Sequence, residues 1–129
     1  MKWEGFVFKI DYWGKTATIT KYTGDQTKIV IPASIKEDDD EFAVKYIGWY
    51  KVYVNHDDVY NSREIVGHRL RHFRIVGAFR QSKITDVTVP ESITSIERLA
   101  FPEGTVIHGN LGSNAEKYAK EYGHRFEPI

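Results

Sequence analysis

The chain contains Lys28-Ile29-Val30-Ile31-Pro32-Ala33-Ser34-Ile35, and the same pattern returns as Asp86-Val87-Thr88-Val89-Pro90-Glu91-Ser92-Ile93. Both copies read apolar-x-apolar-Pro-x-Ser-Ile. The proline ends a strand in each copy because it has no N–H to donate to a neighbouring strand. A repeated strand and turn is typical of a solenoid, in which each unit buries its apolar face against the next unit.

Each copy leads into a second apolar segment, at 46–50 after the first copy and at 95–101 after the second. Upstream, residues 6–10 and 16–20 alternate in polarity on either side of Trp13-Gly14-Lys15, which predicts a hairpin. Aromatic residues make up 14 % of the chain, a level that suits β-structure. The first two thirds of the chain are therefore expected to be mainly β.

The C-terminal region carries a helix signal. Ser113 stands at the N-cap position and Glu116 at the third helical position, which together form a capping box. Gly123 is expected to end the helix in the left-handed conformation, with 124–126 leaving as a short strand. The expected buried face consists of Ala115, Tyr118, Ala119 and Tyr122.

The middle of the chain is the least regular part. We interpret residues 53–83 as a degenerate repeat with an insertion of roughly ten residues, in which Ala78-Phe79 echoes Ala100-Phe101. The apolar spacing of 63–73 fits neither a helix nor a strand cleanly, so both remain open.

Composition excludes several classes of site. There is no cysteine, so disulfides, thiolate nucleophiles and cysteine-based zinc sites are absent. The formal net charge is +0, which gives no reason to expect nucleic acid or an anionic membrane as a partner. No signal peptide is visible behind Met1-Lys2-Trp3-Glu4-Gly5, and no apolar stretch is long enough to cross a bilayer. We expect a soluble chain, either cytoplasmic or exported with its leader removed.

Two charged clusters and a group of histidines each have a structural and a functional interpretation. The five acids at 37–41 predict a solvated loop, and they lack the spacing of a calcium-binding loop. Residues 63–74 are rich in arginine, which predicts a solvated basic face or a patch for an acidic partner. His56, His68 and His72 raise the hypothesis of a metal-dependent hydrolase, although the His-Glu-x-x-His motif is missing.

The segments 29–35 and 84–96 resemble the BspA-type leucine-rich repeats of bacterial proteins, whose unit of about 23 residues reads roughly Leu-x-x-Val-x-Ile-Pro-x-Ser-Val-x-x-Ile-Gly-x-x-Ala-Phe. Ile47-Gly48 fits the Ile-Gly step, and Ala100-Phe101 fits the Ala-Phe step. Lys51-Val52 stands where the first unit would have Ala-Phe. The resemblance implies adhesion or protein recognition and no common catalytic site.

The sequence thus predicts a mainly β chain with a C-terminal helix, folded as a short leucine-rich-repeat-like solenoid with a parallel ladder. We expect one domain over 1–129, with an N-terminal hairpin cap (1–27), repeats (28–107) with an irregular insertion (53–77), and a C-terminal cap with the helix (108–129).

The predicted function is non-catalytic protein recognition or adhesion, through the ladder or the insertion. The alternative is a carbohydrate or small-ligand module that uses exposed aromatic rings. No catalytic residue, metal or cofactor is expected. The expected partner is a protein, with self-association through the open solenoid edge as a second form of contact. The candidate interaction surface consists of Trp49, Tyr50, Tyr53, Tyr60, Arg69 and Arg71.

Overall fold

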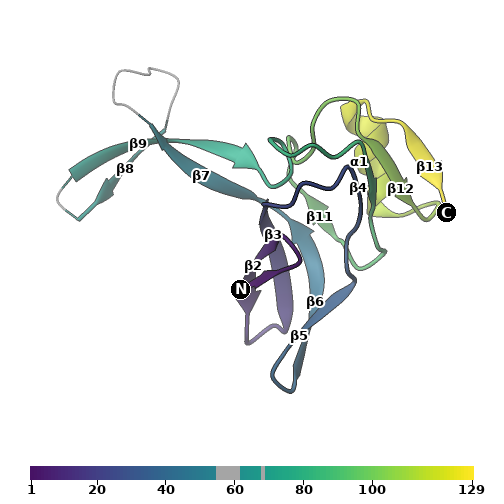
Figure 1. The fold of residues 1–129 in the computed structure, drawn as a ribbon, viewed down its shortest axis with the longest axis horizontal. Helices are drawn as coiled ribbons and strands as arrows, with labels where there is room; N and C mark the ends of the chain where they lie inside the picture. Colours follow the sequence, from purple (N-terminus) through teal and green to yellow (C-terminus); the bar gives the residue numbers. More distant parts are fainter. Residues whose placement is uncertain (55–61, 68) are drawn as a thin grey trace.

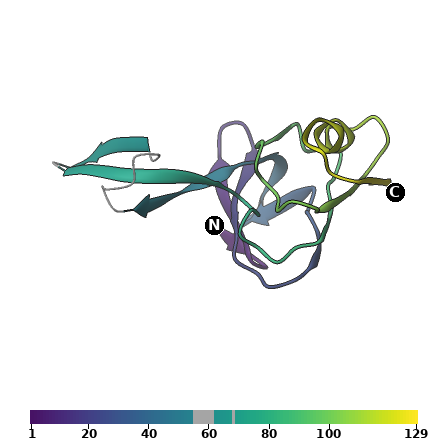
Figure 2. The same ribbon diagram turned by 90° about the horizontal axis from the view of Figure 1, so that it is seen from above.

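The computed structural model describes residues 1–54, 62–67 and 69–129. The described residues form a mainly β structure with one helix near the C-terminus (Figure 1). Three sheets are present in this part of the chain: one of six strands, one of four and one of three. The three-stranded sheet projects away from the other two, which surround the core (Figures 1 and 2).

The four-stranded sheet contains both copies of the repeated segment. Its strands follow the order β13-β12-β10-β4, and every neighbouring pair is parallel. Asp86 pairs with Lys28 on one side and with Val106 on the other. The strands are β4 (Lys28–Val30), β10 (Asp86–Thr88), β12 (Val106–Gly109) and β13 (Phe126–Pro128).

The six-stranded sheet begins with the N-terminal hairpin, which the structure confirms. β1, β2 and β3 pair antiparallel, whereas β3 pairs with β6 and β6 with β11 in parallel. β5 pairs antiparallel with β6 beside this path. The strands are β1 (Lys2–Trp3), β2 (Phe6–Asp11), β3 (Thr16–Tyr22), β5 (Ser34–Glu37), β6 (Asp40–Ile47) and β11 (Ser95–Ile96).

The acidic run at 37–41 forms the turn between β5 and β6 and the strand ends that flank it. Asp38 has a φ of 55°, a left-handed conformation that the tight turn requires. The side chains of 38–41 are exposed, as a run of like charges favours. Two contacts tie this turn to the β2–β3 turn: Lys15 Nζ lies 2.6 Å from Asp40 Oδ1, and the Tyr12 hydroxyl donates to Glu37 Oε2 at 2.9 Å.

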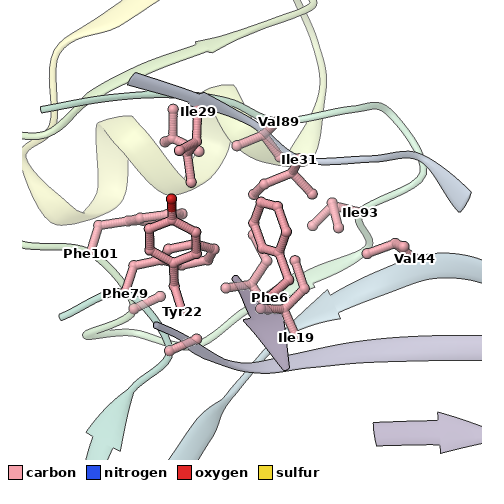
Figure 3. Packing of buried hydrophobic residues seen from close by; sticks show 14 of the residues in the cluster. Phe6, Ile19, Tyr22, Ile29, Ile31, Val44, Phe79, Val89, Ile93 and Phe101 are labelled. Atoms are coloured by element: carbon pink, nitrogen blue, oxygen red, sulfur yellow. The ribbon is translucent and has the colours of Figure 1, made fainter. Parts of the chain in front are cut away.

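One apolar core lies between the four-stranded and six-stranded sheets (Figure 3). Aromatic rings run through it in sequence. Phe79 has no exposed surface, and its ring centroid lies 5.5 Å from that of Tyr22 and 5.2 Å from that of Phe101. Phe101 in turn meets Tyr118 of the helix at 5.8 Å. Burial raises the pKa of Tyr118 to about 12, and its hydroxyl donates to the Arg98 carbonyl oxygen at 2.9 Å.

The helix α1 (Asn114–Tyr122) has the predicted caps. The Ser113 hydroxyl oxygen accepts from the Glu116 N–H, and Gly123 has a φ of 77°. The Glu116 carboxylate accepts from the Gly112 N–H at 3.0 Å, one residue before the position that the capping box predicts. Tyr122 lies on the predicted face, with its ring centroid 4.9 Å from that of Tyr118, and is 39 % exposed at the end of the helix. The strand after the helix is Phe126–Pro128, two residues later than expected.

A hydrogen bond joins the two ends of the projecting sheet. The Ala78 N–H donates to the Gly48 carbonyl oxygen at 2.9 Å, and the Phe79 N–H donates to the Ala100 carbonyl oxygen at 2.8 Å. In space, Ala78-Phe79 therefore follows Ile47-Gly48, the place that the resemblance gave to Lys51-Val52, and the three-stranded sheet lies between these two segments in the sequence.

Candidate functional site: the projecting arm

The candidate site is the three-stranded antiparallel sheet, called the arm from here on. It consists of β7 (Trp49–Val54), β8 (Ser62–Val66) and β9 (Arg69–Gly77), in the order β7-β9-β8. The structure therefore decides for strand in the described part of 63–73. The arm contributes no residue to the main apolar cluster, and it extends away from the body in both views (Figures 1 and 2).

Strand periodicity and register assign the arm residues to two faces. Successive side chains of a strand point to opposite faces, and directly paired residues share one. Lys51 pairs with Ile75, Tyr53 with Phe73, and Glu64 with Arg71. These residues therefore share one face, called the front face, which consists of Trp49, Lys51, Tyr53, Glu64, Arg71, Phe73 and Ile75.

Glu64 links two strands of the front face. Its Oε2 lies 2.6 Å from Lys51 Nζ, and its Oε1 accepts from the Tyr53 hydroxyl at 2.5 Å. The hydrogen bonds from Lys51 and Tyr53 lower the pKa of the Glu64 carboxyl. The same bonds to Glu64 raise the pKa of Lys51 and of Tyr53. Glu64, Lys51 and Tyr53 thus form one hydrogen-bonded cluster across the front face.

Two cations hold the aromatic rings of the front face. Lys51 Nζ lies 4.6 Å from the centroid of the Phe73 ring, and Arg71 Cζ lies 4.6 Å from that of the Tyr53 ring. The rings of Tyr53 and Phe73 meet edge to face with centroids 6.4 Å apart. These contacts position the rings on the front face.

The front face leaves large apolar side chains in solvent. Trp49 is 41 % exposed, Tyr53 45 % and Ile75 51 %. Aromatic residues and arginine are the types enriched at protein interfaces, where they supply most of the binding energy. An ordered face with exposed apolar groups and fixed charges is suited to recognition.

The structure brings together some members of the predicted interaction surface. Trp49, Tyr53 and Arg71 share the front face. Tyr50 lies on the opposite face near the base of the arm, where Lys21 Nζ is 4.7 Å from its ring centroid. Arg69 is a residue of β9, but its side chain, like the whole of Tyr60, lies outside the described part of the chain.

Sequence reasoning missed Lys51, Glu64, Phe73 and Ile75. Once Trp49–Val54 is known to be a strand, the two-residue spacing of Trp49, Lys51 and Tyr53 puts Lys51 on the same face as the two aromatic residues. Nothing in the sequence pairs Glu64 with them, because that contact depends on the register of β8 and β9.

The histidine hypothesis falls mostly outside the described residues, since His56 and His68 are not among them. Across residues 1–54, 62–67 and 69–129, no group of three or more His, Asp or Glu side chains is arranged to hold a metal ion. In the same ranges, no helix combines the length and the apolar character that crossing a membrane demands.

A solved structure has a fold similar to that of this chain, whereas sequence comparisons found no match. No protein-family model matches the chain, and no curated protein matches it. The fold is similar to that of a leucine-rich cell surface protein from Faecalibacterium prausnitzii A2-165, with a TM-score of 0.55 and 20 % sequence identity. The match covers 100 % of this chain and 29 % of that protein.

This likeness concerns the fold alone. It supports a leucine-rich-repeat-like architecture for a mainly β chain with a C-terminal helix. The chain spans 29 % of the length of that surface protein, so the activity of the whole neighbour does not transfer to it.

Proposed function

We propose that this chain is a non-catalytic recognition module, in which a short leucine-rich-repeat solenoid presents the arm and the front face of the arm binds a protein partner. The single observation that carries the proposal is the front face itself. It exposes Trp49, Tyr53 and Ile75 on a sheet that lies outside the core.

The solenoid part of the proposal rests on two sets of parallel pairings. One set runs β3-β6-β11 and the other runs β4-β10-β12-β13. Between one strand and its next parallel neighbour, the chain would make one turn of a coil, as in stacked repeats. We further propose that the whole chain is one domain of the BspA type, and that the edge of β4 is its open end. Self-association there remains a prediction.

We also propose an adhesion role, because the structural neighbour is a leucine-rich cell surface protein. We propose export for this chain on the same basis. The carbohydrate alternative keeps one specific observation in its favour, since the exposed rings of Trp49 and Tyr53 could stack on a sugar.

Photo-crosslinking tests the proposal. A benzoylphenylalanine residue replaces Ile75 on the front face, and in a control protein it replaces Leu111, which is 72 % exposed just before α1, away from the arm and from the edge of β4. Both proteins are irradiated in an extract of the source organism. We expect a discrete protein adduct from position 75, abolished by Trp49→Ala combined with Tyr53→Ala in the same chain.

Equal adducts from both positions, or adducts from position 111 alone, would contradict binding by the arm. A glycan array separates the alternative. Specific glycan binding that is lost with the Trp49→Ala and Tyr53→Ala changes, without any protein adduct, would replace protein recognition with carbohydrate recognition.

A further inference from the structure

A second candidate site lies in the body of the protein. A pocket of about 360 Å³ opens where the segment after the arm, the Ala100-Phe101 step and the end of α1 meet. This volume is at the lower end of the range for small-ligand sites. The side chains that matter for its chemistry belong to Arg80, Arg98, Leu99, Tyr122 and His124.

The pocket is rich in positive charge. Arg80 donates to the Phe101 carbonyl oxygen at 3.0 Å, which fixes its guanidinium at the pocket wall. Its other nitrogen lies 3.9 Å from Glu103, whose side chain is 92 % exposed, so this ion pair is weak. For Arg98, no carboxylate of the described residues lies within 4.0 Å. Two permanent cations therefore meet one solvated carboxylate.

A fixed imidazole and two apolar groups complete the pocket. His124 Nδ1 lies 3.0 Å from the Thr105 carbonyl oxygen, which can only accept, so Nδ1 carries a proton and donates it. The imidazole stacks on Tyr118 with ring centroids 5.6 Å apart. Leu99 is 50 % exposed and Tyr122 is 39 % exposed, so both offer apolar surface to a ligand.

We propose that this pocket binds the C-terminal carboxylate of a protein chain whose last residue is apolar. The planar guanidinium of arginine matches a carboxylate through two parallel hydrogen bonds, which a free Arg98 can supply with support from Arg80. The last side chain packs against Leu99 and Tyr122. Gly104 and Gly123 also line the pocket and carry no side chain, so we place the exit of the rest of the bound chain beside them.

This inference goes beyond the proposed function and does not depend on it, because none of the pocket residues lies on the front face. The probes are N-acetylphenylalanine, its primary amide, and the tripeptide N-acetyl-Ala-Ala-Phe with a free carboxylate. Binding is measured by NMR titration of the intact chain. We expect a Kd of about 1 mM for the free acid, as its small size allows. The amide should bind at least about tenfold more weakly because it lacks the charge.

Variants assign the effect to the pocket. Arg98→Ala should weaken binding of the free acid about tenfold or more. The affinity of Arg98→Lys should lie between those of wild type and Arg98→Ala, because lysine keeps the charge but cannot form two parallel hydrogen bonds. Arg74→Ala, an exposed arginine of the arm, is the matched control and should leave binding unchanged. Thermal melting confirms that each variant is folded.

Equal binding of acid and amide would overturn the carboxylate assignment, and so would equal losses in Arg98→Ala and Arg74→Ala. A tripeptide that binds at least as tightly as the single residue is expected. Exclusion of the tripeptide would overturn recognition of a chain terminus. Crosslinking from position 75 in the Arg98→Ala protein is expected to persist, so failure of the pocket and failure of the arm are told apart.

Discussion

Phe79 provides a quantitative test of the fold. Its side chain is fully buried, and its ring centroid lies 6.1 Å from that of Phe6, 5.5 Å from that of Tyr22 and 5.2 Å from that of Phe101. Phe79→Ala removes the ring that links the N-terminal hairpin to the Ala100-Phe101 step. Buried Phe-to-Ala changes cost about 3–5 kcal/mol because both transfer free energy and packing are lost.

This loss is large compared with the total free energy of unfolding. A chain of 129 residues is expected to have a free energy of unfolding of about 6–19 kcal/mol. With a urea m-value of about 2 kcal/mol per molar, the Phe79→Ala change lowers the unfolding midpoint by about 2 M. Urea unfolding followed by circular dichroism and by fluorescence measures the shift, and the two signals should coincide.

Ile75→Ala is the matched control for this experiment. Ile75 is 51 % exposed on the arm, so its truncation should cost less than about 1 kcal/mol. Phe79→Leu should recover part of the loss because it refills most of the cavity. If Phe79→Ala costs no more than Ile75→Ala, the aromatic contacts do not hold the core together and the reasoning fails.

Three further changes test separate parts of the structure. Gly77→Ala should destabilise the chain by about 1–3 kcal/mol, because a Cβ there would lie 2.0 Å from the Leu99 carbonyl oxygen; an unchanged urea midpoint would contradict this close approach. Ser113→Ala should cost about 1 kcal/mol through loss of the N-cap, seen as a fall in Tm of about 4 °C, whereas Ser113→Asp should restore most of it. The hydrogen bond from His108 lowers the pKa of the Asp86 carboxyl below its ordinary value of 3.8. The ionised Asp86 carboxylate therefore stabilises the folded chain above pH 3.8, and this stabilisation is lost as the pH falls through the lowered pKa. In urea titrations between about pH 5 and about pH 2.5, wild type should therefore lose more stability than Asp86→Asn, and parallel losses would rule this out.

The parts of the fold that the sequence predicts are those with local signals. Pro32 and Pro90 end the repeated strands, and the strand segments before them pair directly as β4 and β10. Ser113 and Gly123 mark the helix because caps are fixed by one or two residues each. The hairpin of β2 and β3 follows from alternation around a short turn.

The arm could not be predicted because its order depends on non-local pairing. Trp49 to Val54 carries large side chains on both faces, so the segment shows no clear alternation of apolar and polar residues. The partner strand β9 is reached only after β8 and the segment before it. The contacts of Glu64 arise from that pairing, and a single charged residue gives no sign of them.

The position of the arm between Gly48 and Ala78 explains how one chain can carry both an apolar core and an exposed apolar face. The Ala78 N–H donates to the Gly48 carbonyl oxygen, so the segments before and after the arm are joined directly at its base. Three strands are about the minimum for a sheet that holds its own order, and Phe73 and Val76 are its buried residues among those whose side chains are described. The exposed part of Trp49 and of Tyr53, 41 % and 45 % of their surface, adds little to the folding free energy, because burial is what stabilises an apolar group. Ordering those residues still costs conformational entropy. Burial against a partner would cover this exposed apolar surface, and for that reason we propose the arm, and not the core-facing strands, as the recognition surface.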